Sequence, residues 1–134
     1  MIIEVGVSHE INVTVTDKMS AASMRSGSLD VLATPFMVAL MEQAASELCD
    51  KYVPEGISTV GTALNISHLA ATAIGMNVKA VAEVTAFDGR KISFNVKAFD
   101  DAGLIGEGTH ERFTVKIDKF MLKAEERKQS TASN

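Results

Sequence analysis

The hydrophobic pattern predicts one long helix set among several strands. Residues 10–16, "EINVTVT", alternate apolar and polar side chains, which is the period of a half-buried strand. Residues 17–30 are small and polar and predict a loop or a short helical turn. From Val31 to Met41 no side chain is charged. A helix that is apolar on most sides is normally buried, so this helix should be covered by the rest of the domain.

The ends of this helix have recognisable signals. Thr34 suits the N-cap, and Pro35 suits the first helical position, where its missing N–H costs nothing. The helix should run to about Lys51 and end before Pro54 and Gly56.

After the helix, period-two alternation predicts four further strands. In the first of them one face carries Val60, Thr62, Leu64, Ile66 and His68. The next two strands turn inward Val78, Ala80, Ala82 and Val84, and then Ile92, Phe94, Val96 and Ala98. The last, "LIGEGTHERFTVKI", is irregular, and its apolar parity shifts around Gly108 and His110, which predicts a bulge there. Short connections, such as the Asp88-Gly89 turn, predict an antiparallel meander.

This order of elements predicts an α+β fold in which a sheet of about five antiparallel strands wraps around the long helix. We expect a single domain over residues 1–122 and a polar C-terminal tail over residues 123–134. A short helix, "DKFMLKAEERK", should open at Asp118, and the final "QSTASN" should be loose.

Composition narrows the function classes. The chain has 13 Lys and Arg against 17 Asp and Glu, a net charge of −4, which argues against general binding of nucleic acid. The longest apolar runs are too short to span a membrane, and "MIIEVGVSHE" does not resemble a secretory signal. Cys49 is the only cysteine, so we expect a buried structural thiol and a reducing, cytoplasmic location.

Glu42 is the first candidate for chemistry, because it is the lone acid in "ATPFMVALMEQAA". Its neighbours on a helix are Val38, Ala39, Ala45 and Ser46. Burying an unpaired carboxylate is costly, so a carboxylate there usually has a partner or a function. The alternatives are that Glu42 lies on an exposed stripe or pairs with a basic group.

His68 and Thr34 are the other candidates. His68 ends an inward-facing run, so its imidazole should point toward the helix, either as a core histidine or as a proton-transfer group. Thr34 is explained by capping, but a hydroxyl and free N–H groups at a helix start also suit a developing oxyanion. Thr34 and Glu42 are eight residues apart, roughly 12 Å along a helix axis.

The remaining polar residues give weaker signals. His9, His68 and His110 lack metal-ligand spacing, so no metal site is predicted. His110 and Arg112 share one strand face, where a solvated or salt-bridged pair is the simplest interpretation.

Three segments, "VLATPFMVALMEQAA", "GTALNISHLAAT" and "GEGTHERFTV", resemble the single-hotdog acyl-CoA thioesterases of the fluoroacetyl-CoA thioesterase type, over roughly residues 5–120. The resemblance implies a hotdog fold, a homodimer or higher homo-oligomer with sites near the interface, and hydrolysis of small acyl-CoA thioesters. It places the catalytic residues on Thr34, Glu42 and His68 and a substrate-contacting glycine on Gly61. It implies no cofactor, since CoA is part of the substrate.

The phosphates of CoA would require cations, and five are available for that role: Arg90, Lys91, Arg112, Lys116 and Lys119. Three alternative functions stay open: a non-catalytic protein that binds acyl-CoA or another small ligand, a hydratase or dehydratase, and a structural dimer. The sequence leaves open whether Glu42 acts as a nucleophile or a general base, which acyl chain is cleaved, and whether CoA or a carrier protein bears it.

Overall fold

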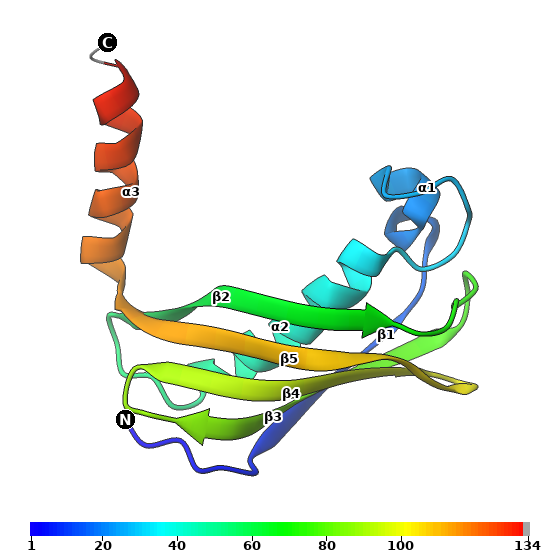
Figure 1. Cartoon of the computed structure of the whole chain (residues 1–134), viewed down its shortest axis with the longest axis horizontal. Coiled ribbons are helices and arrows are strands. Elements are labelled where there is room, and N and C mark those ends of the chain that lie inside the picture. Colours follow the sequence, from blue (N-terminus) through cyan, green and yellow to red (C-terminus); the bar gives the residue numbers. More distant parts are fainter. Residues whose placement is uncertain (133–134) are drawn as a thin grey trace.

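The computed structural model describes residues 1–132 (Figure 1). Its elements in chain order are β1 (Ser8–Thr14), the 3-10 turn η1 (Asp17–Met19), α1 (Ala21–Met24), α2 (Thr34–Asp50), β2 (Ile57–His68), β3 (Asn77–Phe87), β4 (Lys91–Asp100), β5 (Gly103–Lys116) and α3 (Ile117–Ala132). The predicted helix, the short turns before it and the five strands are all present.

The five strands form one antiparallel sheet in the order β1-β3-β4-β5-β2. The predicted meander is therefore correct for β3, β4 and β5 and wrong for β2, which pairs with β5 at the sheet edge. The reason lies in the connection over residues 69–76, which pairs with the chain ahead of α2. Val31 forms a bridge with Ala73, and the Leu32 N–H donates to the Thr72 carbonyl at 2.9 Å.

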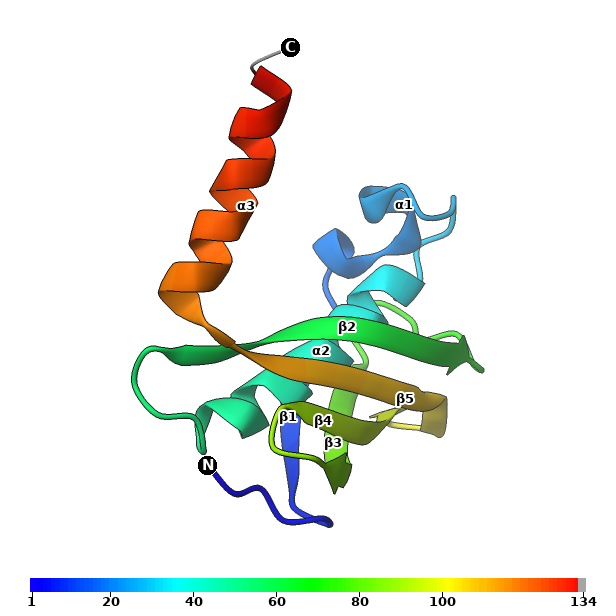
Figure 2. The ribbon, with the colours of Figure 1, turned by 60° about the vertical axis from the view of Figure 1, so that its left-hand side comes forward.

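Helix α2 lies against one face of the sheet (Figure 2). Its apolar side packs on the alternate, buried residues of β3 and β4, as predicted. The core residues at this contact include Met37, Leu40, Met41, Ala44, Leu48, Val78, Ala80, Ala82, Val84, Ile92, Phe94, Val96 and Ala98. The sheet covers only that side of the helix. On the other side Pro35 and Ala39 are exposed, although the helix carries almost no charge there.

The start of α2 differs from the prediction by one residue. Ala33 is the N-cap, because its carbonyl already accepts hydrogen bonds from the N–H groups of Phe36 and Met37. Thr34 is the first helical residue, and no side chain caps the helix. The Thr34 hydroxyl is therefore free for another partner.

A bulge in β2 changes which residues face the helix. The pairing with β5 shifts between Gly61 and Ala63, so Thr62 lies outside the strand register, although its hydroxyl donates to the Glu111 carbonyl of β5. Before the bulge Thr59 and Gly61 face α2, and after it Ile66 and His68 do. The prediction that Val60 and Thr62 share the inner face with His68 was wrong for this reason.

The irregularity of β5 lies nearer its start than predicted. Its pairing with β4 shifts between Ala98 and Phe99, which leaves Ile105 as the extra residue. At Gly108 the pairing is regular, and the glycine serves another purpose: a Cβ there would collide with the Asn65 carbonyl of β2. Close approach of two strands, not a bulge, requires this glycine.

Helix α3 stands away from the sheet and is exposed over residues 117–131 (Figures 1 and 2). It is longer than the predicted short helix and runs through the expected tail boundary at residue 122. Residues 129–132, expected to be loose, are helical, while 133–134 lie outside the described residues. Within residues 1–132 no helix is long and apolar enough to cross a membrane.

Candidate active site

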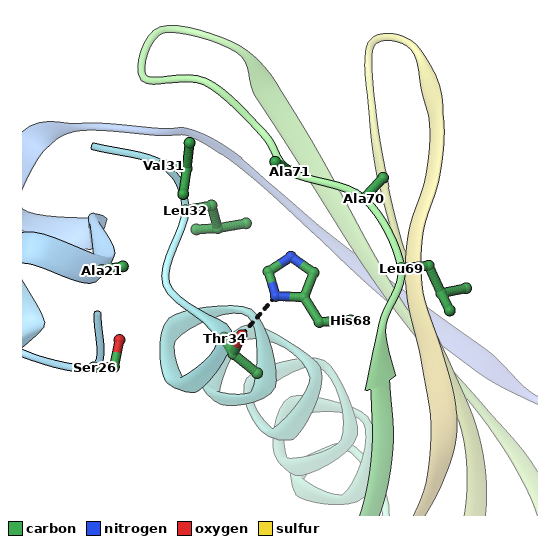
Figure 3. A pocket seen from close by; sticks show the side chains of 9 residues that line it. All are labelled: Ala21, Ser26, Val31, Leu32, Thr34, His68, Leu69, Ala70 and Ala71. Carbon is green, nitrogen blue, oxygen red and sulfur yellow. Dashed lines mark hydrogen bonds between the residues drawn. The ribbon is translucent and has the colours of Figure 1, made fainter. Parts of the chain in front are cut away.

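Thr34 and His68 form the first of two polar clusters along α2 (Figure 3). Thr34 begins the helix and His68 ends β2, and the crossing of these two ends brings their side chains together. Thr34 Oγ1 and His68 Nδ1 share a hydrogen bond of 2.7 Å. The pair lines a hollow of about 310 Å³. Its other walls are mostly small or aliphatic: Ala21, Ser26, Val31, Leu32, Leu69, Ala70 and Ala71.

The second ring nitrogen of His68 is available for chemistry. Nε2 is buried and has no hydrogen-bond partner among the described residues. Burial lowers the pKa of His68, and the backbone of Ala70 opposes this shift. The imidazole is therefore neutral at pH 7, with one nitrogen held by Thr34 and the other able to exchange a proton or a hydrogen bond with a ligand.

Glu42 belongs to the second cluster, at the middle of β2. Its carboxylate Oε2 lies 3.9 Å from Arg112 NH1, and 39% of its side chain is exposed. Gly61 lies directly against it, since a Cβ on Gly61 would be 2.8 Å from Oε2. Both alternatives raised by the sequence thus hold in part: Glu42 is half-exposed and has a basic neighbour. A glycine at 61 leaves the carboxylate accessible.

Arg112 is held rigidly by three acceptors. Its Nε donates to Thr59 Oγ1 at 3.0 Å and NH2 donates to the Thr59 carbonyl at 3.1 Å. NH1 lies 3.3 Å from His110 Nε2. A guanidinium only donates, so His110 Nε2 must accept, and its Nδ1–H then donates to the Ala63 carbonyl at 2.9 Å. The chain of contacts fixes both the tautomer of His110 and the direction of the Arg112 cation.

The electrostatics agree with that tautomer. Burial lowers the pKa of His110, the Arg112 cation lowers it further, and the Ala63 carbonyl opposes the shift. Burial also lowers the pKa of Arg112, but a guanidinium remains charged near neutrality. The site therefore holds one fixed positive charge beside Glu42 and a neutral imidazole behind it.

His110 and Arg112 were expected to be a solvated or salt-bridged pair, and the prediction that they are solvated was wrong. Only 1% of His110 and 6% of Arg112 is exposed. The sequence carries no signal of this burial. The apolar residues Ile105, Phe113 and Val115 of the strand stand at odd positions, whereas His110 and Arg112 stand at even ones, and only the extra residue at Ile105 brings the even positions onto the core face. Two polar side chains at buried positions need partners inside the protein, and Thr59, the residue that holds Arg112, is equally unmarked in the sequence.

Cys49 is buried in the core, as expected of a structural thiol, and burial raises its pKa. Among residues 1–132 no group of His, Cys, Asp or Glu is placed to hold a metal ion.

The predicted site residues thus fall into two sets in one chain. Thr34 and His68 share the hollow, whereas Glu42, Gly61 and Arg112 gather outside it. Together the two sets offer a hydroxyl at a helix start, an imidazole, an accessible carboxylate and a fixed cation. These groups suit acyl transfer, in which an oxyanion develops and a proton must move.

Comparison with known proteins agrees with this chemistry. A family model for fluoroacetyl-CoA-specific thioesterase matches residues 15–118. The fluoroacetyl-CoA thioesterase of Streptantibioticus cattleyicolor is 40% identical over 98 residues, which cover 73% of this chain and 70% of that protein. A solved structure of a fluoroacetyl-CoA thioesterase superposes with a TM-score of 0.88 at 32% identity and covers 92% of this chain and 96% of that one.

A Thermus thermophilus protein of the thioesterase superfamily is also similar, with a TM-score of 0.92 at 27% identity and 98% of both chains covered. These likenesses confirm the predicted hotdog fold, a sheet curled round one central helix. The chain belongs to the fluoroacetyl-CoA-specific thioesterase family.

Proposed function

We propose that this protein hydrolyses the thioester of a small acyl-CoA to the free acid and CoA. The observation that carries the proposal is the accessible carboxylate of Glu42, held beside a fixed cation, together with the Thr34–His68 pair over an apolar hollow. Family membership supports the same reaction. No cofactor is needed, because water and side chains supply all the chemistry, and the cytoplasm supplies acyl-CoA.

The proposed mechanism assigns each group a role. The backbone N–H of Thr34, at the positive end of the α2 dipole, stabilises the oxyanion of the tetrahedral intermediate. The Thr34 hydroxyl donates to His68 Nδ1, which places the proton of the neutral imidazole on Nε2. Glu42 either takes the proton of the attacking water or attacks the carbonyl itself to form an anhydride that water opens. His68 Nε2 moves a proton toward the departing sulfur. Arg112 NH1, 3.9 Å from Glu42 Oε2, orients the carboxylate.

The lining of the hollow supports a short, uncharged acyl group. The hollow measures about 310 Å³, and no charged side chain except a protonated imidazole could face the ligand there. A carboxylate on the acyl chain would lose its water without gaining a partner, which is costly.

We further propose that the complete site forms between two copies of the chain. Strand β2 has 12 residues and pairs on one side only, so its other edge is open, and Leu64 on it is 42% exposed. Two β2 strands paired antiparallel about a two-fold axis would bring the His68 end of one beside the Gly61 half of the other. Glu42 of one chain would then reach the hollow of its partner, which it does not line in its own chain.

Replacing Glu42 with Gln tests the reaction. Glu42→Gln keeps the size of the side chain and removes the base or nucleophile, so hydrolysis should fall about 10²- to 10⁴-fold. The measurement is free thiol released from acyl-CoAs ranging from acetyl to long-chain. Glu47→Gln is the matched control, because Glu47 lies on the same helix but bonds to His9 and Gln43 outside the site.

Wild-type protein that binds acyl-CoA without cleaving any member of the panel would overturn the proposal in favour of a binding protein. Single turnover in H₂¹⁸O can establish the anhydride route: label enters the Glu42 carboxylate only if Glu42 attacks the thioester and water then opens the anhydride at the Glu42 carbon.

Mixing two inactive variants tests the shared site. Random pairing of Glu42→Gln with His68→Asn chains should restore about a quarter of wild-type activity, since half of the dimers then carry one intact site. No recovery after the subunits have exchanged would place all catalytic residues in one chain. Sedimentation of the wild type gives the oligomeric state independently.

A further inference from the structure

A cationic groove lies between α3 and the neighbouring ends of β2 and β5. It measures about 550 Å³. We call it the α3 groove and define it by four cations, Arg90, Lys116, Lys119 and Lys123, together with Phe120 and Ile57. Figures 1 and 2 show α3 rising from the end of β5 beside the start of β2. The groove is separate from the hollow of Thr34 and His68.

Its charge stands out against the rest of the protein, which carries a net charge of −4. None of the four side chains forms an ion pair with a carboxylate among residues 1–132, whereas Lys79 and Lys91 elsewhere on the sheet do. Arg90 interacts electrostatically with Asp88, so the uncompensated charges are those of Lys116, Lys119 and Lys123. Like charges held together repel each other, and a bound polyanion relieves that repulsion. Basic side chains in a concave site are the usual partners of phosphate groups.

Phe120 adds a second feature that points to the same kind of ligand. It is 40% exposed in the groove, between the lysines that precede and follow it on α3. An exposed aromatic ring among cations suits a phosphorylated nucleoside, whose base stacks on the ring while its phosphates meet the lysines.

The groove is also at a suitable distance from the candidate site. Ile57 pairs with Lys116, and Gly61 pairs with Arg112 on the same two strands. Four residues of strand separate the two pairs, a distance of about 13 Å. The arm of CoA between sulfur and phosphate has about as many bonds as four extended residues, roughly 14 Å.

We propose that the α3 groove binds the phosphorylated adenosine end of CoA, with its phosphates on Lys116, Lys119 and Lys123 and its adenine on Phe120. This inference rests on the proposed function, because it names the part of the same substrate that lies outside the reacting centre. It makes the protein selective for CoA over a thioester that lacks the nucleotide.

The test compares acyl-CoA with acyl-pantetheine, which has the same thioester and arm but no nucleotide. Reversing two charges with Lys119→Glu/Lys123→Glu should raise KM for acyl-CoA about tenfold or more, with kcat unchanged. Kinetics with acyl-pantetheine should not change. The control Arg127→Glu/Lys128→Glu makes the same charge change on the same helix, outside the groove, and should behave as wild type. Equal KM values for acyl-CoA in both double variants would overturn the proposal.

Binding of adenosine 3′,5′-bisphosphate, measured by calorimetry, separates this inference from the proposed function. The groove predicts binding to the wild type and to the control, and loss in the Lys119→Glu/Lys123→Glu variant. Phe120→Ala should weaken this nucleotide about fivefold or more and leave inorganic pyrophosphate unaffected. If neither thioester is hydrolysed but the bisphosphate binds as described, the proposed thioesterase function is wrong and the proposed nucleotide site in the α3 groove is supported. If thioesters are hydrolysed and the bisphosphate does not bind the wild type, only the proposed nucleotide site in the α3 groove is wrong.

Discussion

Gly61→Ala tests the position of Glu42 with the smallest possible change. The added Cβ would lie 2.8 Å from Glu42 Oε2, 3.1 Å from His110 Cε1 and 3.3 Å from Arg112 NH1. The backbone of Gly61 is not in the left-handed region, so alanine fits the local conformation. The perturbation is therefore steric and is aimed at the second cluster.

The response of the site follows from what can move. His110 and Arg112 are buried and hydrogen-bonded, whereas Glu42 is half-exposed. Its carboxylate must shift by about 0.6 Å to reach ordinary contact at 3.4 Å. Misplacing a reacting group by about 1 Å costs on the order of 10²-fold in rate, so we expect a loss of about 10- to 100-fold in kcat. Stability should change by less than about 1 kcal/mol, because the entropy lost by the unfolded chain offsets the crowding.

Two measurements on the same sample separate activity from folding. Free thiol release gives kcat and KM, and urea unfolding gives the free energy of unfolding. Gly27→Ala is the control for the methyl group itself, since a Cβ there would meet only Ala21 Cβ at 3.3 Å. Wild-type kcat in Gly61→Ala would refute the reasoning, because it would mean that the Glu42 position seen here is not the one used. A large loss of stability would show that the backbone of β2 moves to accommodate the methyl group, and not the Glu42 carboxylate.

Three further predictions concern the polar clusters. Thr34→Val keeps the shape of the side chain but removes the bond to His68; kcat should fall about 10- to 100-fold with an unchanged melting temperature, and unchanged turnover would refute a role for the hydroxyl. Arg112→Met leaves the Thr59 acceptors unpaired and should lower the free energy of unfolding by about 1–3 kcal/mol, read from urea curves. The pKa values of His68 and His110 are lowered in the folded state, so unfolded chains bind more protons than folded ones below about pH 6.5. The free energy of unfolding should therefore be highest above that pH and fall as the pH drops. A free energy of unfolding that does not change with pH would contradict the buried neutral imidazoles.

The elements that the sequence predicted well are those whose pattern reflects one local environment. Strands β3 and β4 are buried along one face over their whole length, and helix α2 packs its apolar side against that face. The alternation of apolar and polar residues therefore predicts their inner faces correctly. The β2 prediction failed at Thr62, because a bulge reverses parity and its cause is a pairing with β5 that lies far away in the sequence.

The same contrast runs through the candidate site. Glu42 and His68 are conspicuous in the sequence because each is a lone titratable group in an apolar run. Their partners are not, since Arg112, His110 and Thr59 come together only when β2 and β5 pair.

The sequence by itself determined the helix, the sheet-forming segments and the residue types available for acyl transfer, because hydrophobic periodicity and isolated charges are local properties. Only the tertiary structure decided that the Thr34 hydroxyl bonds to His68 and does not cap the helix. It also decided that the buried Arg112 cation lies beside Glu42, and that the Glu42 carboxylate and the His68 imidazole occupy separate clusters in one chain. Those outcomes depend on strand order, register and one bulge, which are set by packing between distant segments and leave no mark on any single stretch of sequence.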